Sequence, residues 1–292
     1  MKVAIFGRPF DKTIKEHILR FFDNLKHHHI KLLIHQDFYH FLIHEMDYKP
    51  FDARVFRKYH ELDKDTDLMF SIGGDGTILD AITIVQDSGV PIVGINTGNL
   101  GFLASIAKDE IDHALEAIYA KNYILEERSL LKLKSPVTVF QDFPYGLNEI
   151  AVQKIDSTMI KVHVFIDDEF LNTYWADGLI VSTPTGSTAY SLSVGGPIII
   201  PTSGNFIISP ISPHNLTVRP IVLPDDSKLH LKLESRAVNF IASIDHRSVV
   251  INNTMDLKIE KADFKIRLLK LNTTSFYKTL RNKLMWGADK RN

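Results

Sequence analysis

Cysteine is absent from the chain of 292 residues. Its absence excludes disulfide bonds, thiolate nucleophiles and cysteine-ligated zinc, and it fits a reducing compartment. The sequence also lacks an apolar run of the roughly 18 residues that a transmembrane helix needs, so we expect no membrane partner. The apolar start is interrupted too early, by Arg8-Pro9, to be a signal peptide. The expected compartment is therefore the cytoplasm.

The sequence also lacks an excess of positive or negative charge. The chain has 34 Lys plus Arg against 35 Asp plus Glu, which gives a formal net charge of −1. A protein that coats nucleic acid needs a basic excess, so we expect no nucleic-acid partner. With 45% hydrophobic and 24% charged residues, the composition is that of a globular protein.

The periodicity of apolar residues changes along the chain. In the first third, expected strands at 3–6, 30–34, 67–72 and 91–95 alternate with segments of helical spacing, which predicts a parallel α/β sheet. After a helix expected at 109–120, alternation with period two predicts an antiparallel β-sandwich. We therefore expect an α/β nucleotide-binding domain at 1–105 and a β-rich domain at 106–272. The amphipathic tail, 273–292, is expected to pack back on the first domain.

The first informative motif is Gly73-Gly74-Asp75-Gly76-Thr77, which lies between an expected strand and an expected helix. Glycines let a backbone approach a phosphate, and a helix N-terminus offers N–H groups to an anion. An acidic residue in such a loop can accept a proton, hold a metal or cap the helix. The motif matches neither the Walker-type loop nor the Rossmann fingerprint.

Three further segments carry polar groups suited to a nucleotide. A second glycine-rich segment, 94–103, also follows a strand, where ligands of open α/β sheets bind. Asn148-Glu149 offers an amide and a carboxylate to sugar hydroxyls and base edges. The hydroxyl-rich segment 177–191 contains Tyr190, which can stack on a base or lie in the core. Elsewhere, His40 and His44 have a spacing that can ligate zinc, but a solvated helix face is the favoured interpretation.

In their order and separation, these four segments resemble the NAD kinase family over about residues 67–250. The first motif alone is shared with diacylglycerol and sphingosine kinases, and a lipid kinase of that class is the alternative. The resemblance implies the NAD-kinase fold and transfer of the γ-phosphoryl group of ATP to the 2′-hydroxyl of the adenosine ribose of NAD, giving NADP and ADP. It also implies a divalent cation, Mg²⁺, accompanying ATP, no resident metal held by the protein, and a homodimer or homotetramer.

The resemblance assigns the role of proton acceptor to Asp75. Phe102 matches an aromatic wall, Asp177 a carboxylate near the nicotinamide, and residues 188–191 a segment around the adenine. The full set expected to contact the nucleotides is Gly73, Gly74, Gly76, Phe102, Asn148, Glu149, Asp177, Thr188, Ala189, Tyr190, Ser191 and Arg247.

The sequence departs from the family pattern at four positions. Asp80 and Asn99 stand where basic residues are frequent, and Trp175 replaces a basic residue two places before Asp177. His246 interrupts the more usual Asp-Gly-Gln or Asp-Gly-Arg. These departures leave open the donor preference among ATP, other triphosphates and polyphosphate, and the choice between NAD and NADH.

Overall fold

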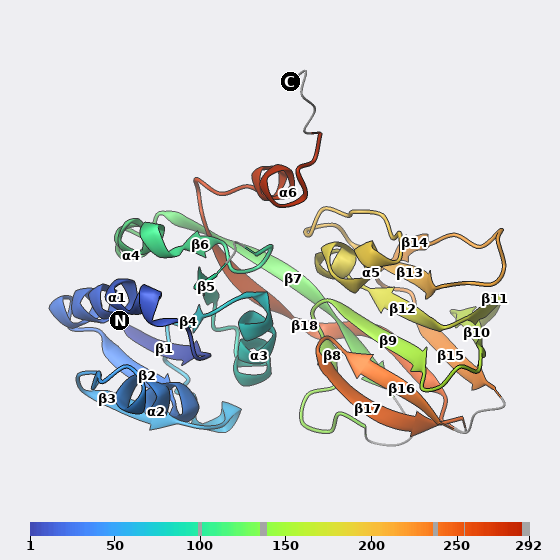
Figure 1. The fold of residues 1–292 in the computed structure, drawn as a ribbon, viewed down its shortest axis with the longest axis horizontal. Helices are drawn as coiled ribbons and strands as arrows, with labels where there is room; N and C mark the ends of the chain where they lie inside the picture. The colour runs from blue at the N-terminus through green and yellow to red at the C-terminus, as the bar shows by residue number, and fades with distance from the viewer. Residues whose placement is uncertain (99–100, 135–138, 236–238, 254, 288–292) are drawn as a thin grey trace. The chain divides into compact units, whose positions relative to one another are not determined.

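The computed structural model describes residues 1–98, 101–134, 139–235, 239–253 and 255–287. The chain forms two compact units (Figure 1). Unit 1 comprises Met1–Glu127 with Ile266–Asn292, and unit 2 comprises Arg128–Lys265. Two strands, β7 (Tyr123–Lys134) and β18 (Leu257–Leu271), contribute residues to both units. The domain boundaries expected from the sequence, after residues 105 and 272, stay predictions.

Unit 1 is built on parallel strands, as the alternation of strands and helices predicts. The strand order is β18-β5-β4-β1-β2-β3, and every pair along it is parallel. The short β6 pairs with β5, also in parallel. The bounds are β1 Lys2–Gly7, β2 Lys31–His35, β3 Ala53–Phe56, β4 Leu68–Ile72, β5 Ile92–Asn96 and β6 Ile106–Ala107.

Helices cover this sheet through their apolar faces. Ile18, Phe21 and Leu25 are buried in α1, at the helical spacing seen in the sequence. Figure 1 shows α1 beside α4, and the Tyr119 hydroxyl of α4 donates a hydrogen bond to Asn24 of α1, with 2.9 Å between the oxygens. The bounds are α1 Lys15–His27, α2 Gln36–His44, α3 Asp75–Val85, α4 Ile111–Tyr119 and α6 Phe276–Leu284, with 3₁₀ turns η1 Lys12–Ile14, η2 Tyr59–Glu61 and η3 Lys108–Glu110.

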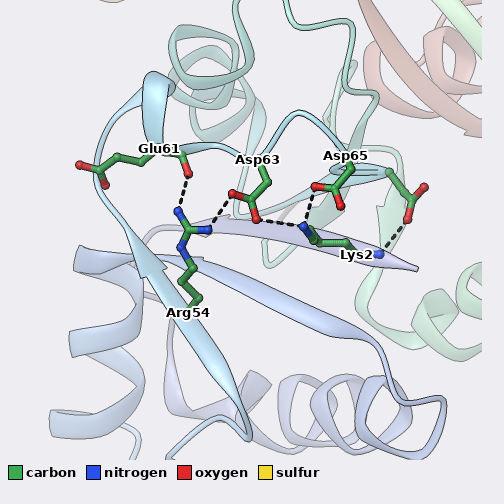
Figure 2. Close-up of polar contacts among 6 residues, drawn as sticks. Lys2, Arg54, Glu61, Asp63 and Asp65 are labelled. Carbon is green, nitrogen blue, oxygen red and sulfur yellow. Dashed lines mark hydrogen bonds and ion pairs between the residues drawn. The ribbon is translucent and has the colours of Figure 1, made fainter.

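A network of charges ties β1 and β3 to the loop before β4 (Figure 2). The Lys2 ammonium lies 3.0 Å from Asp63 and 2.5 Å from Asp65. Asp63 also accepts a hydrogen bond from Arg54 at 2.7 Å, and Arg54 donates to the Glu61 carbonyl. Since each cation contacts two acceptors, the network fixes this loop more firmly than an isolated surface pair would.

Unit 2 is antiparallel, as the period-two alternation predicts. One sheet has the order β14-β13-β12-β9-β16-β17, and a second group has the order β11-β10-β15-β18. Alternate apolar residues of both groups form one core cluster. The bounds are β8 Tyr145–Gly146, β9 Glu149–Lys154, β10 Ile160–Ile166, β11 Glu169–Ala176, β12 Gly178–Ser182, β13 Asn205–Ile211, β14 Ile221–Pro224, β15 Leu229–Glu234, β16 Asn239–Ile244 and β17 Arg247–Asn252, with η4 Thr185–Thr188 and α5 Tyr190–Ser193 between β12 and β13.

Across the described ranges, no helix is long and apolar enough to cross a membrane. The C-terminal α6 is a surface helix with a single buried side chain, that of Leu280.

Candidate active site

Asp75 occupies the first turn of α3, directly after β4 and its glycines. Its carboxylate accepts three backbone hydrogen bonds. Oδ2 accepts from the N–H of Phe102 at 2.8 Å, and Oδ1 accepts from the N–H groups of Leu103 and Ala104 at 3.1 and 2.9 Å. Among the described residues, these bonds use both lone pairs of Oδ1 and one of Oδ2, so Oδ2 keeps one that can accept a proton or a hydroxyl hydrogen bond.

The loop that binds Asp75 is packed without spare room. A Cβ added to Gly101 would lie 1.8 Å from Asp75 Oδ1, so only glycine permits this approach. On the other side of the loop, the buried Lys270 of β18 donates from Nζ to the Leu103 carbonyl at 3.3 Å. The Leu103 peptide is thus held through both its N–H and its carbonyl. Asn99 lies outside the described residues.

The glycines of the first motif serve two purposes. Gly73 has a φ of +153°, and a Cβ there would lie 2.1 Å from Thr77 Oγ1, so the turn requires glycine. A Cβ at Gly74 or Gly76 would meet no described atom within 4 Å. The backbone beside Asp75 is therefore open to a ligand at the positive end of the helix dipole.

Two other predicted positions of unit 1 have defined surroundings. Phe102 is half-buried, with its ring centroid 6.4 Å from that of Phe276 and the Lys283 ammonium 5.2 Å above it. Asp80, one of the departures from the family pattern, forms an ion pair with Arg8 at 2.6 Å. A carboxylate at position 80 thus places an arginine beside α3.

In unit 2, Asn148 and Glu149 lie at the start of β9. The segment is held from one side by Asp245, whose carboxylate accepts the N–H groups of Leu147, Asn148 and Glu149 at 3.0, 2.7 and 3.2 Å. From the other side, Thr183 donates from its hydroxyl to the Leu147 carbonyl at 2.6 Å and from its N–H to the Asn148 carbonyl at 2.9 Å. Two segments that lie far apart in the sequence therefore hold this pair.

Close packing joins Asn148 to the hydroxyl-rich turn. Gly186 donates from its N–H to Thr183 Oγ1, and a Cβ at Gly186 would lie 2.0 Å from the Asn148 carbonyl oxygen. The backbone N–H of Tyr190 favours the charged form of the Glu149 carboxyl, against the larger effect of burial. The structure therefore brings Asn148 and Glu149 together with the segment that contains Tyr190.

The Glu149 carboxyl is buried and has an unusual pKa. Burial, together with the negative charge of Asp245, raises the pKa of Glu149 to about 8. Its Oε2 has no hydrogen-bond partner among the described residues. A buried carboxyl of this kind is a candidate ligand-binding group.

The remaining predicted residues of the adenine-facing segment differ in what their side chains offer. Thr188 donates from its hydroxyl to the Thr185 carbonyl, and Ala189 caps α5. Ser191 is fully buried, and its hydroxyl shares a hydrogen bond of 3.1 Å with Ser209. The Tyr190 side chain is half-buried, so part of its ring is open to solvent.

Asp177 and Arg247 are engaged within unit 2. Asp177 forms an ion pair of 2.6 Å with Lys154. Arg247 donates to the carbonyls of Phe143 and Tyr145 at 2.6 and 2.7 Å, and its guanidinium lies over the Phe143 ring. These contacts orient Arg247 toward the turn before β8.

The last two departures from the family pattern lie on the surface of unit 2. Trp175 is 44% exposed, beneath the Lys161 ammonium at 4.7 Å. His246 is exposed in the turn between β16 and β17.

Sequence reasoning did not single out Asp245, Thr183, Gly101 or Lys270 as site residues. Their partners lie far from them along the chain, and local patterns carry no information on such contacts. Gly101 and Thr183 do lie in the two motif segments 94–103 and 177–191, and Asp245-His246 is a polar turn between two apolar strands, which by itself predicts a hairpin.

Comparison with known proteins shows the family to which the chain belongs. The model of the ATP-NAD kinase N-terminal domain matches residues 3–123, and that of the C-terminal domain matches residues 147–271. The NAD kinases of Cytophaga hutchinsonii and Bacteroides fragilis are each 45% identical to the chain, over 293 and 292 residues, with all of both chains covered.

Solved structures of two NAD or NADH kinases are similar to this chain. An NAD kinase from Archaeoglobus fulgidus in complex with ATP has a TM-score of 0.75 and 26% identity, covering 98% of this chain and 99% of the other. Yeast NADH kinase has a TM-score of 0.86 at 21% identity, covering 99% and 88%, which shows the common fold.

Fold and matches together define a phosphotransferase that acts on nucleotides. More particularly, the chain belongs to the ATP-NAD kinase family, and its reaction is the phosphorylation of NAD to NADP with ATP as donor. The match of both halves to this family excludes the lipid-kinase alternative.

Proposed function

We propose that Asp75 accepts the proton of the 2′-hydroxyl of the adenosine ribose of NAD while that oxygen attacks the γ-phosphorus of ATP. The bond from the ribose oxygen to phosphorus forms, the bond to the β-phosphate oxygen breaks, and ADP leaves. The observation that carries this role is the free lone pair on Oδ2 of a carboxylate fixed by three N–H groups. Phosphoryl transfer depends on such positioning, and a general base contributes about 10²–10⁴-fold.

Recognition of NAD is assigned to residues of unit 2. Asn148 and Glu149 present an amide and a carboxyl on a backbone that is fixed from two sides, and Tyr190 offers an aromatic ring. Asp177 and Arg247 add a carboxylate and a guanidinium to this set, and Phe102 of unit 1 is proposed as an aromatic contact of a nucleotide. Thr188, Ala189 and Ser191 contribute backbone groups, because the hydroxyls of Thr188 and Ser191 already have partners.

ATP is assigned to the glycine loop of unit 1, where Gly73 shapes the turn and the space beside Gly74 and Gly76 is open. The NAD kinase from Archaeoglobus fulgidus was solved in complex with ATP, which supports this donor. Within the described ranges, no three His, Asp or Glu side chains gather as a metal cage. We assign Mg²⁺ to the triphosphate oxygens of ATP. When bound, the ion neutralises the charge that develops on the phosphates.

A homodimer or homotetramer in the cytoplasm is the proposed state. The apolar segment Pro197–Pro201 leaves Ile200 45% exposed beside the adenine-facing segment, and a neighbouring subunit would cover it. The neighbouring apolar run Phe206–Ile208 is fully buried in β13, so it belongs to the core.

The experiment that tests the proposed function is a panel of donors and acceptors. The purified chain is incubated with Mg²⁺ and ATP, another triphosphate or polyphosphate, and with NAD or NADH, and the phosphorylated product is read by a coupled dehydrogenase. We expect the highest kcat/KM with ATP and NAD. A higher value with polyphosphate would contradict the assigned donor, and activity in excess EDTA would contradict the assigned role of Mg²⁺.

A further inference from the structure

Three consecutive backbone N–H groups converge on one side chain, the Asp245 carboxylate. Oδ1 accepts from Asn148 and Glu149, and Oδ2 accepts from Leu147. The Asp245 N–H in turn donates to the Glu149 carbonyl at 2.9 Å. Four hydrogen bonds therefore fix a three-residue segment to one residue that lies far along the chain from it.

The turn between β16 and β17 makes this arrangement possible. Asp245 has a φ of +53°, in the left-handed region that aspartate tolerates better than most residues. Ile244 pairs with Arg247 across the hairpin, so Asp245 and His246 alone form the turn. Because Ile244 is also paired with Ile150 of β9, the turn sits beside the start of that strand.

The Glu149 carboxyl lies close enough to Asp245 for their charges to interact. Two adjacent carboxyls that are shielded from water hold one proton between them, because ionising both costs Coulomb and desolvation energy. Burial raises the pKa of Asp245, but its three N–H donors and the Arg247 guanidinium oppose that shift. For Glu149, only the Tyr190 N–H opposes the effect of burial among the described residues, and Oε2 has no hydrogen-bond partner among them.

The donors therefore decide which carboxyl carries the proton. The Asp245 carboxylate accepts three N–H groups, whereas Glu149 Oε2 has no hydrogen-bond partner among the described residues. From β12, Ser182 is paired directly with Glu149 and contributes a buried hydroxyl but no charge. These contacts favour the negative charge on Asp245 and the proton on Glu149.

We propose that Asp245 is a positioning residue for NAD binding. It fixes the Asn148–Glu149 backbone through the three N–H groups and keeps the neighbouring Glu149 carboxyl protonated, so that Glu149 donates a hydrogen bond to the nucleotide. An ionised Glu149 could only accept one. The effect of Asp245 on the Glu149 backbone and carboxyl is a property of the free protein, whereas the hydrogen bond from Glu149 to NAD rests on the proposed function.

The first test uses the free protein labelled with ¹³C at the glutamate carboxyls. The resonance missing from Glu149→Gln identifies Glu149, and we expect it to titrate near pH 8 in the wild type. In Asp245→Asn the neighbouring charge is gone, so the midpoint should fall by at least about one pH unit. Asp167→Asn is the matched control, because Asp167 is also a turn aspartate with positive φ that accepts a backbone N–H. This control should leave the midpoint unchanged.

A wild-type midpoint below about pH 6, or a midpoint that Asp245→Asn does not move, would overturn the proposal. The wild-type titration alone decides whether Glu149 is protonated at neutral pH, even if Asp245→Asn does not fold.

Hydrogen exchange tests whether Asp245 fixes the backbone. Amides 147–149 should exchange at least about tenfold faster in a folded Asp245→Asn protein than in the wild type, since an amide that loses a hydrogen bond opens more readily. Equal exchange rates would contradict the positioning role.

The second test measures NAD affinity from about pH 6 to 10 by titration without ATP. The wild-type affinity should fall above pH 8, that of Glu149→Gln should not depend on pH over this range, and that of Asp245→Asn should fall at lower pH than the wild type. If Glu149 titrates near pH 8 but NAD affinity is constant, the proposed contact between Glu149 and NAD is wrong while the role of Asp245 in the free protein stands. The two failures are thereby distinguishable.

Discussion

The Asp75 carboxylate, at the start of α3, is the proposed proton acceptor. Asp75→Asn removes this acceptor and places an amide N–H₂ against backbone donors, so kcat should fall by about 10²–10⁴-fold. Stability should fall by about 1–2 kcal/mol, since at least one N–H loses its acceptor. Steady-state kinetics and thermal unfolding measure the two effects. Asp87→Asn, which alters a carboxylate just beyond the other end of α3, is the control, and equal kcat losses in the two variants would remove Asp75 from the role of base.

The substitution Gly101→Ala tests whether the position of the Asp75 carboxylate matters as much as its charge. In Gly101→Ala the added Cβ would overlap Asp75 Oδ1, so either the carboxylate or the loop must move. A displacement of about 1 Å at a reacting group costs on the order of a hundredfold in rate, and we expect kcat to fall by that amount with the fold retained. Gly98→Ala in the same segment meets its nearest atom at 3.9 Å and should be close to neutral. Wild-type kcat in Gly101→Ala would show that the loop adapts freely.

At the scale of elements, the contact between the η4 turn and the start of β9 joins two of the four motifs. Gly186→Ala would place a Cβ 2.0 Å from the Asn148 carbonyl oxygen and separate the two segments. We expect the KM for NAD to rise by about tenfold or more, and that for ATP to change less than about threefold, as the contact lies in the proposed NAD site. Gly204→Ala, with its nearest contact at 3.7 Å, is the control for unit 2. A rise confined to the KM for ATP would reverse the assignment of the two nucleotides.

The sequence predicts elements of this fold better than it predicts their contacts. Apolar spacing identifies α1, β4 and β10 because each buries one face or is buried throughout, and the periodicity records that burial. Helical spacing does not identify the short α2, whose histidines interrupt the apolar stripe formed by the buried Phe38 and Phe41. The location of Asp75 at a helix start follows from its glycines, whereas the three N–H donors at 102–104 depend on how a distant loop closes.

At the scale of the whole molecule, Glu149 makes stability depend on pH. The unfolded chain releases the Glu149 proton above about pH 4.5, whereas the folded chain keeps it to about pH 8, because burial raises the pKa of Glu149. The unfolded state therefore binds fewer protons between these values, and the free energy of unfolding falls as pH rises, by up to about 1.4 kcal/mol per pH unit. Glu149→Gln removes this loss, so its melting temperature should exceed that of the wild type by a margin that grows from about pH 5 to pH 8.

Glu234→Gln is the matched control for this pH dependence. Hydrogen bonds from Lys161 and His163 hold the pKa of Glu234 below its ordinary value, so the stability that it contributes is present above that value and is lost only as pH falls. Its melting-temperature difference from the wild type should therefore not grow between about pH 5 and 8. A constant difference for Glu149→Gln over the same range would contradict a buried, protonated Glu149.

Assembly is tested at Ile200, whose exposed side chain does not belong to the core. If a neighbouring subunit covers it, Ile200→Asp should give a folded protein that sediments as a smaller particle and binds NAD more weakly. Val222→Asp is the control, because Val222 is an equally exposed apolar residue, at 41%, on the edge strand β14. A particle of unchanged size with wild-type activity would remove Ile200 from any interface.

Unit 1 is made from both ends of the chain, and this has a consequence during translation. Its sheet places Leu268 of β18 beside Ile92 of β5, yet the ribosome must add residues 128–265 between them. At ~5–20 residues per second this takes roughly 7–28 s, during which one edge of β5 lacks its partner strand. Unit 2 is continuous in sequence and can fold in that interval. A nascent chain arrested before residue 266 should therefore hold a protease-resistant unit 2 and a protease-sensitive unit 1, with the open strand edge exposed to chaperones until synthesis ends.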